Sequence, residues 1–228
     1  MNENSSGDGT PSGGTVSTPV VVLTTLEVLL MFAGILAYIW RWQRIAPHSW
    51  IVLLALILVS HVLHRDTPRS LGFSIAEMIP SARQILPVAL ALYLPLLGYG
   101  FAGRSLNLLC PNLPSLVLFA GYGAWCAVQQ YLAQGYFHNR LMLLIRNRHT
   151  SSALVGILFG ATHIPNVTLM IATLVAGTVF AEVFARHRSI WALALAQAVG
   201  GLLLAAVIPD AVIHHMRVGP GYYFYGIR

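Results

Sequence analysis

The run WCAVQQYLAQ, residues Trp125–Gln134, and the segment FGATHIPN, residues Phe159–Asn166, decide how this chain is interpreted. Two adjacent amides, Gln129 and Gln130, interrupt the first apolar run, and an imidazole, His163, ends the second. Polar side chains at membrane depth are costly and are rarely placed there for packing alone. We therefore expect these amides and this imidazole to act together.

The composition around these residues is that of a membrane protein. Of 228 residues, 57% are hydrophobic and only 9% are charged, whereas a soluble domain carries about 25% charged residues. This excludes an ordinary cytosolic globule and predicts an all-α fold, a polytopic integral membrane helical bundle. Apolar runs able to cross a core of about 30 Å predict about seven transmembrane helices, within a range of six to eight. They occupy residues 19–41, 49–63, 85–102, 113–134, 151–164, 167–185 and 190–208.

The composition also divides the chain into three parts. Residues 1–18, rich in Ser, Gly, Thr and Pro, predict a disordered tail. Residues 19–208 predict a single membrane domain, and the Tyr-rich residues 209–228 predict an interfacial aromatic tail. Trp40–Arg44 follows the first run in place of a small-residue cleavage site, so we expect a retained helix and no cleaved signal peptide.

Two connecting segments carry local predictions. Only Ile164, Pro165 and Asn166 separate the runs 151–164 and 167–185, and proline disfavours helix continuation, so these runs predict a tight helical hairpin. Leu71–Arg83 mixes apolar residues with serine and glutamate, which favours an interfacial amphipathic helix.

The positions of the arginines predict how the chain is oriented in the membrane. All thirteen basic residues are Arg, the net charge is +6, and they lie singly or in pairs between apolar runs. This pattern suits anionic headgroups and gives no nucleic-acid signal. Placing a loop at 135–150 in the cytoplasm puts eight arginines there, which favours that orientation. The eight are Arg65, Arg69, Arg83, Arg140, Arg146, Arg148, Arg186 and Arg188; the other five are Arg41, Arg44, Arg104, Arg217 and Arg228.

Two further residue pairs resemble metal ligands, but their spacing argues against that role. Cys110 and Cys126 have no ligand spacing, so we interpret them as small apolar filler. His214 and His215 are adjacent, and neighbouring side chains on a helix diverge by about 100 degrees. We interpret them as surface histidines at the membrane interface.

The candidate site begins with four amides. Gln130 and Gln134 would share one helix face, with Gln129 on its neighbouring edge. Gln197 is the strongly polar residue of the last run, and Gly200-Gly201 would let a backbone or a substrate approach closely. Such amides either join helices, at about 0.6 to 2 kcal/mol each, or contact a substrate.

Two ionisable residues complete the candidate site. His163 could exchange protons or bind a metal near neutral pH, or simply donate to a carbonyl. Glu182 is the sole carboxylate of its run, so it is either functional or turned toward Arg186, one turn on.

The order of these polar sites resembles the CPBP family of intramembrane proteases, which includes CAAX prenyl endopeptidases and bacterial abortive-infection proteins. That family typically shows E-E-x-x-x-R, then F-x-x-x-H, then H-x-x-x-N on successive membrane helices. Gln129–Gln134, Phe159–His163 and Gln197–Gly201 match it in order and spacing, within a resemblance spanning about 85–208. Among the key polar positions, identity is retained only in the middle motif.

The resemblance implies an intramembrane endopeptidase that hydrolyses membrane-associated peptides or proteins. His163 would then be a general base or ligand, Gln129 and Gln130 would orient water and substrate, and Gln197 would donate to the oxyanion. Asn166 would position His163. Gln134 replaces the family's arginine, and Glu182 would be an alternative base.

An inactive relative is the alternative. Glutamine cannot accept a proton near neutral pH, so Gln129 cannot replace the family's water-activating glutamate. The protein would then bind a membrane peptide or lipoprotein in an immunity, sorting or scaffold role. Expected partners are the lipid bilayer and a membrane-anchored peptide or protein; expected cofactors are none, or a divalent metal with His163 as its only likely ligand. The expected location is the bacterial inner membrane.

Overall fold

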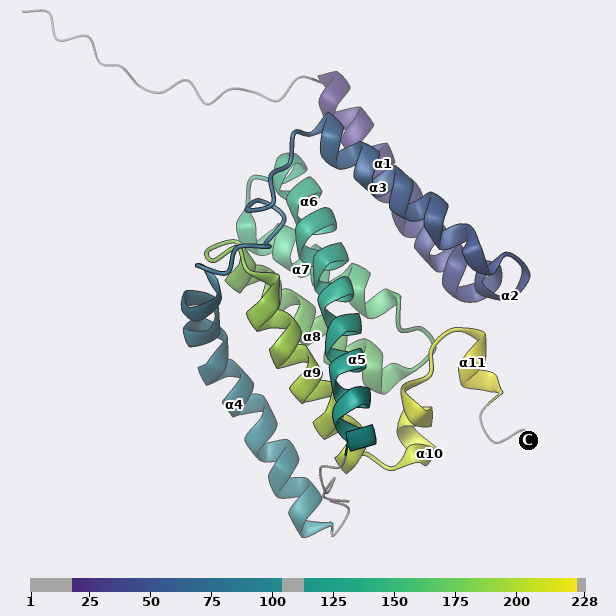
Figure 1. Ribbon diagram of the computed structural model, residues 1–228, viewed down its shortest axis with the longest axis vertical. Coiled ribbons are helices and arrows are strands. Elements are labelled where there is room, and N and C mark those ends of the chain that lie inside the picture. The colour runs from purple at the N-terminus through teal and green to yellow at the C-terminus, as the bar shows by residue number, and fades with distance from the viewer. Residues whose placement is uncertain (1–17, 104–112, 225–228) are drawn as a thin grey trace, which may run out of the picture.

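The computed structural model describes residues 18–103 and 113–224 (Figure 1). The predicted N-terminal tail, apart from Thr18, lies outside these ranges, as do Cys110, Arg104 and Arg228. Within them the chain forms helices and connecting segments, with no strand and one isolated bridge between Phe73 and Ser189. The predicted all-α class is therefore confirmed for the described chain.

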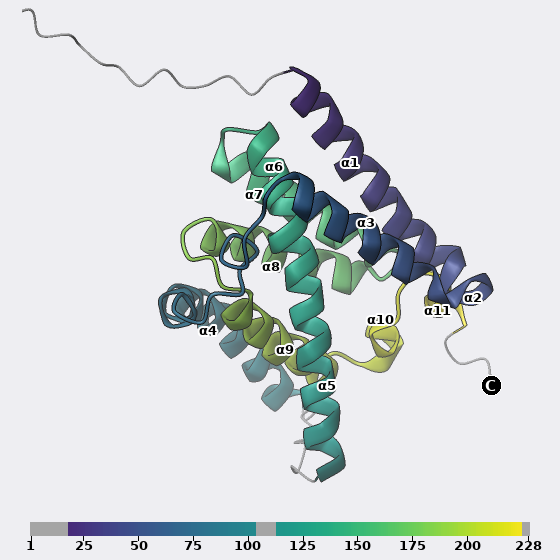
Figure 2. The ribbon, with the colours of Figure 1, turned by 45° about the horizontal axis from the view of Figure 1, so that its top comes forward.

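An N-terminal helical hairpin packs against one side of the main bundle. Its long helices are α1 (Thr18–Ala37) and α3 (Trp50–Leu63), joined through η1 (Tyr38–Trp42), α2 (Gln43–Ile45) and η2 (Pro47–Ser49). In Figures 1 and 2 α1 and α3 run beside each other on one side of α5, and α4 lies with α9 on the other.

Helix α4 (Met78–Ala102) corrects the prediction for the segment before it. We expected an amphipathic helix at Leu71–Arg83, but residues 64–77 are turns and bends, and helix begins only at Met78. The residues expected at the end of that helix, up to Arg83, are instead the first turns of α4. The prediction is therefore wrong for residues 71–77.

One uninterrupted helical stretch carries the adjacent glutamines. It consists of α5 (Leu113–Gln130), the π-helical segment η3 (Tyr131–His138) and α6 (Asn139–Leu144). The prediction of a loop at 135–150 is therefore wrong, because the helix continues to Leu144 and a new helix begins at Arg148. π-Helical turns are frequent at functional sites, and this one begins directly after Gln130.

The predicted hairpin is confirmed: α7 (Arg148–Ala161) packs against α8 (Val167–Phe184). Small residues allow a close approach, since a Cβ on Gly156 would lie 2.0 Å from Thr178 Oγ1. Gly177 faces back, and a Cβ there would lie 3.1 Å from the Gly156 Cα. The two helices of the hairpin thus pack with their backbones in close contact at these glycines.

Helix α9 (Ile190–Val207) packs between α4 and α5, and the chain then turns back in short helices. These are α10 (Asp210–Ile213), η4 (His214–Met216) and α11 (Pro220–Tyr223). His214 and His215 have positive φ, so they do not stand on a regular helix as assumed. His215 pairs with Asp210 at 2.9 Å, and the His214 ring stacks on Tyr222.

Two apolar clusters hold these elements together. One joins the N-terminal hairpin to the bundle through Met31, Ile57, Tyr136 and Val155. The other joins α4, α8 and α9, with Phe184 fully buried. Cys126 is buried beside Ala194 and Ala198 of α9, consistent with its interpretation as apolar filler.

Four described helical stretches are long and apolar enough to cross a membrane: Thr18–Ile45, Met78–Ala102, Val167–Phe184 and Ile190–Val207. The apolar stretch Pro47–Leu63 is shorter. The expected number of seven stays a prediction.

Candidate functional site

A large apolar cavity lies among α1, α3, α4, α5 and the helices that follow. Its volume is about 1020 Å³. Aliphatic and aromatic side chains form most of its wall, and Gln129, Gln197 and His163 contribute polar groups to it. The cavity therefore brings together parts of all three predicted polar sites.

Three glutamines form one hydrogen-bonded chain between α5 and α9. The Gln130 amide donates to Gln197 Oε1 at 2.6 Å, and Gln197 Nε2 donates to Gln129 Oε1. Gln130 is fully buried, whereas Gln129 and Gln197 are partly buried and line the cavity. The three amides are thus linked across the helix interface, Gln129 and Gln197 reach the cavity wall, and the buried Gln130 Oε1 has no hydrogen-bond partner among the described residues.

The approach of α9 to its neighbours depends on Gly200 and Gly201. A Cβ on Gly201 would lie 2.0 Å from Tyr122 Oη, and one on Gly200 would lie 2.7 Å from Tyr93 Oη. Tyr93 also donates to the Ala196 carbonyl at 2.7 Å. The close approach expected at this glycine pair is therefore made by two tyrosine side chains, which fix the rotation of α9 and so the direction of Gln197.

His163 lies just after the end of α7 on the cavity wall. Its Nδ1 lies 2.8 Å from the Phe159 carbonyl oxygen, which can only accept, so Nδ1 carries the proton. The ring also packs edge-on against Phe159. In the neutral imidazole, Nε2 is then the acceptor, which is the atom a base or a ligand requires.

The Asn166 side chain does not bond to the His163 ring as expected, and only the backbone N–H of this residue donates to the His163 carbonyl, at 2.9 Å. Its Oδ1 accepts from the Leu169 backbone and caps α8, while its Nδ2 donates to Ile213 and Arg217 carbonyls at 2.8 and 3.2 Å. Asn166 therefore ties the C-terminal segment to the hairpin turn, a tertiary role that spacing along the chain cannot reveal.

Gln134 is separate from the amide chain. It is fully buried in η3, and neither of its amide atoms has a hydrogen-bond partner among the described residues. Its position four residues after Gln130 therefore does not bring it into the site.

Glu182 turns neither to Arg186 nor to His163. Its carboxylate pairs with Arg148 at 3.1 Å and His149 at 2.8 Å, at the start of α7. His163 follows the other end of that fourteen-residue helix, about 20 Å away at 1.5 Å per residue. The prediction of Glu182 as an alternative base is therefore wrong, because no single water can bridge the two groups.

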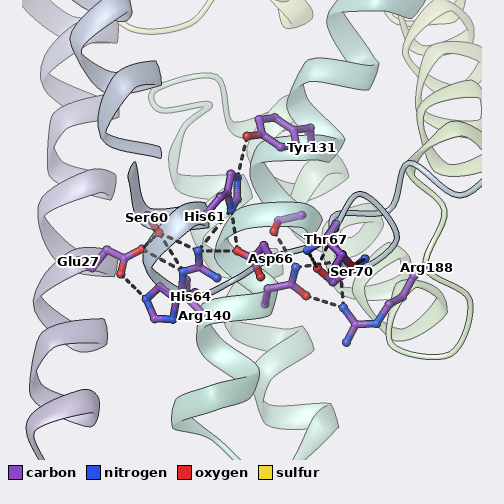
Figure 3. A network of polar contacts seen from close by, with 12 residues as sticks. Glu27, Ser60, His61, His64, Asp66, Thr67, Ser70, Tyr131, Arg140 and Arg188 are labelled. Atoms are coloured by element: carbon purple, nitrogen blue, oxygen red, sulfur yellow. Dashed lines mark hydrogen bonds and ion pairs between the residues drawn. The ribbon is translucent and has the colours of Figure 1, made fainter. Parts of the chain in front are cut away.

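A buried charged network, missed in the sequence, lies beside the cavity (Figure 3). Arg140, 1% exposed, reaches Glu27 at 3.0 Å and Asp66 at 2.7 Å. Ser60 and His64 also bind Glu27, and His61 lies between Asp66 and the Tyr131 hydroxyl. Glu27 is a lone carboxylate in a long apolar run, the same signal that singled out Glu182, so the sequence did contain a sign of it.

The network continues to the turn between α8 and α9. Arg188 donates to Asn139 Oδ1 at 2.7 Å and to the Ser70 carbonyl at 3.0 Å. Asn139 Nδ2 also donates to that carbonyl, at 2.9 Å. The non-helical segment 64–77 is thus attached to α6 and to the α8–α9 turn by charged and amide side chains.

One comparison with known proteins assigns the chain to a family. Residues 18–203 match the family described as type II CAAX prenyl endopeptidase Rce1-like. This chain belongs to the Rce1-like family. It is accordingly an integral membrane protein of the CAAX-protease-like class. No curated protein and no solved structure gave a match.

The match to the Rce1-like family is wider than the resemblance at residues 85–208 suggested. It begins at residue 18 and so includes α1, which carries Glu27, and α3, which carries its partner Ser60. Within the described ranges, no three His, Cys, Asp or Glu side chains are grouped closely enough to hold a metal ion. The histidine of the F-x-x-x-H pattern is present in this Rce1-like chain. Glutamines occupy the positions of the two glutamates, the arginine and the later histidine, and Gly201 occupies that of the asparagine.

Proposed function

We propose that this protein is a binding member of the Rce1-like family, which holds a membrane-anchored peptide or lipoprotein in its cavity without hydrolysing it. The observation that carries the proposal is the chain Gln130–Gln197–Gln129, which stands where the family pattern has two glutamates and a histidine. We place the protein in the bacterial inner membrane as a multi-pass protein with an immunity, sorting or scaffold role.

The chemistry of the amide group supports binding over hydrolysis. An amide donates and accepts hydrogen bonds but takes no proton near neutral pH, so Gln129 and Gln130 cannot activate a water as a base. A peptide backbone presents the same donors and acceptors that these amides use with one another. Exchanging one amide contact for a backbone contact therefore replaces one hydrogen bond by another of the same kind.

The positions of the carboxylates support the same conclusion. None of the described carboxylates lines the cavity, and each of them is paired with arginine or histidine elsewhere. They are Glu27, Asp66, Glu77, Glu182 and Asp210. His163 is thus the single strong base candidate that the described residues place on the wall.

The cavity is suited in size and character to such a ligand. Ligand sites usually enclose about 300 to 1,000 Å³ with mostly apolar walls and a few polar groups, and this one measures about 1020 Å³. Its walls would hold apolar side chains or a lipid modification, while Gln129 and Gln197 would orient the backbone.

Peptide hydrolysis is the second candidate, and the hydrogen bond of His163 favours it. Because Nδ1 donates to Phe159, Nε2 is the acceptor and could take a proton from water at the cavity wall. In this alternative the three amides would orient the water and the scissile carbonyl.

One reconstitution separates the two functions. The full-length protein in bilayers is offered a library of membrane-anchored peptides, and wild type is compared with His163→Ala. His149→Ala is the matched control, because that ring is exposed and lies outside the cavity. We expect binding without cleavage in all three proteins. Cleavage by wild type and His149→Ala that is lost in His163→Ala would establish hydrolysis instead.

A second experiment tests the amides directly. Replacing both Gln129 and Gln197 by leucine should weaken peptide binding about three- to thirtyfold for each amide contact that is lost, the range expected for one amide hydrogen bond inside a membrane. Replacing Gln129 and Gln130 by glutamate asks whether the site is a silenced protease. Turnover that appears only in the glutamate variant would mean that the amides themselves prevent hydrolysis.

A further inference from the structure

A second, smaller cavity lies where α4 begins and α8 ends. It measures about 490 Å³ and is lined by Pro80, Arg83, Gln84, Arg186 and His187. It shares no lining residue with the large cavity. Two guanidinium groups from elements about a hundred residues apart in the chain thus meet at one depression.

The charges at this depression are suited to an anion. None of the ion pairs formed within residues 18–103 and 113–224 uses Arg83 or Arg186, and both side chains are exposed. His187 pairs with Glu77 at 3.5 Å, but Glu77 is also held by Arg69 at 3.1 Å. The depression therefore has two guanidinium groups available to a ligand.

Gln84 adds a polar group between them. Its Oε1 is buried and has no hydrogen-bond partner among the described residues. Its amide nitrogen is a donor, so this lining residue can give an anion a third hydrogen bond in the depression.

The position of the depression indicates which anion it meets. Helices α4, α8 and α9 are three of the four candidate membrane spans, and the depression lies at the first two turns of α4 and in the α8–α9 turn. Three apolar helices thus end together here, as in the headgroup layer of a bilayer. In Figure 1 the start of α4 and the α8–α9 turn lie side by side.

An exposed apolar stripe continues from Arg83 along α4. Leu86, Leu90 and Leu94 follow at helical spacing, with exposed fractions of 55, 45 and 59%. A cation followed by an apolar stripe matches a phospholipid, whose phosphate lies above its acyl chains. A soluble phosphate has no apolar part that could contact the stripe.

We infer that Arg83 and Arg186 bind the phosphate of an anionic phospholipid, with its acyl chains along Leu86, Leu90 and Leu94. Guanidinium groups bind phosphate through paired N–H donors, and each cation near an anionic surface strengthens binding. The inference is independent of what occupies the large cavity.

Native mass spectrometry of the full-length protein tests it, after reconstitution with equal amounts of phosphatidylglycerol and phosphatidylcholine. Wild type should retain phosphatidylglycerol preferentially. Replacing Arg83 and Arg186 by glutamine should reduce that preference about thirtyfold. The matched control is Arg41→Gln with Arg44→Gln, which removes two exposed arginines from the η1–α2 segment and should retain the preference.

Three results would overturn the inference. The first is an equal preference for phosphatidylglycerol in wild type and the Arg83/Arg186 variant. The second is a loss of that preference in the Arg41/Arg44 control as large as the loss in the Arg83/Arg186 variant. The third concerns the source of the phosphate: complete displacement of the lipid by inorganic phosphate would identify a soluble anion site. Unchanged elution and helix content show that each variant is folded, since the substituted side chains are exposed.

Discussion

Arg140 Nη2 donates to Asp66 Oδ2 at 2.7 Å and so connects helix α6 to the non-helical segment that follows α3. The guanidinium is 1% exposed and also pairs with Glu27 of α1. One buried cation thereby holds three separate parts of the chain, and it stands beside the π-helical segment that follows the adjacent glutamines.

Replacing Arg140 by glutamine should destabilise the protein by about 3 to 5 kcal/mol, because the buried carboxylates of Glu27 and Asp66 would lose their permanently charged partner and keep only His64 and His61 as ion-pair partners. The midpoint of thermal unfolding in detergent measures this. Arg69→Gln is the control: that side chain is 77% exposed in its pair with Glu77, so its loss should cost no more than about 1 kcal/mol. Equal losses of stability in the two variants would contradict the argument that the buried ion pairs of Arg140 contribute more than the exposed pair of Arg69.

Acid should weaken the same network. Burial opposes ionisation of Asp66, but hydrogen bonds from Arg140 and His61 outweigh it and hold the Asp66 pKa below its ordinary 3.8. A lowered folded pKa gives stability that is present above the ordinary value and is lost as pH falls through the folded value. At pH values below about 4, the midpoint temperature of unfolding should fall further for wild type than for Asp66→Asn. Parallel acid curves for the two proteins would disprove this.

Gly156 should not tolerate a side chain. An added Cβ would meet Thr178 Oγ1 at 2.0 Å and the Leu174 carbonyl at 2.6 Å, so Gly156→Ala should destabilise the α7–α8 hairpin by about 1 to 3 kcal/mol. Gly98→Ala is the control, because a Cβ there meets nothing within 4 Å and alanine favours helix by about 1 kcal/mol. Thermal unfolding should therefore shift in opposite directions, and a shift in the same direction would refute the packing argument.

Asn166→Ala should release the C-terminal segment as well as uncap α8. Asn147→Ala removes a comparable cap from α7, where Oδ1 accepts from the Thr150 backbone, and should cost about 1 kcal/mol. The loss at Asn166 should be larger, because two carbonyls at Ile213 and Arg217 also lose their donor. Limited proteolysis after Val207 should be faster only in the Asn166 variant; equal cleavage of both would show that the tail is held by other contacts.

Several features could be predicted because they depend on residues close together in the chain. The α7–α8 hairpin follows from Pro165 between two apolar runs, and the family pattern follows from the order of Gln129, His163 and Gln197. The errors at Leu71–Arg83 and at 135–150 concern helix ends in mixed sequence, where tertiary contacts decide between helix and turn. Arg140 and Asn139 of α6 attach residues 64–77 as turns, and this contact was not foreseeable from composition.

The sequence by itself determined the all-helical membrane class, the Rce1-like family and the polar positions, because hydropathy and motif order are linear properties of the chain. Only the tertiary structure decided the partners. Gln197 joins Gln129 and Gln130, Glu182 turns to Arg148, and Glu27 meets Arg140 across 113 residues. These pairings depend on how packing rotates each helix, and at α9 that rotation is set by tyrosines resting on Gly200 and Gly201.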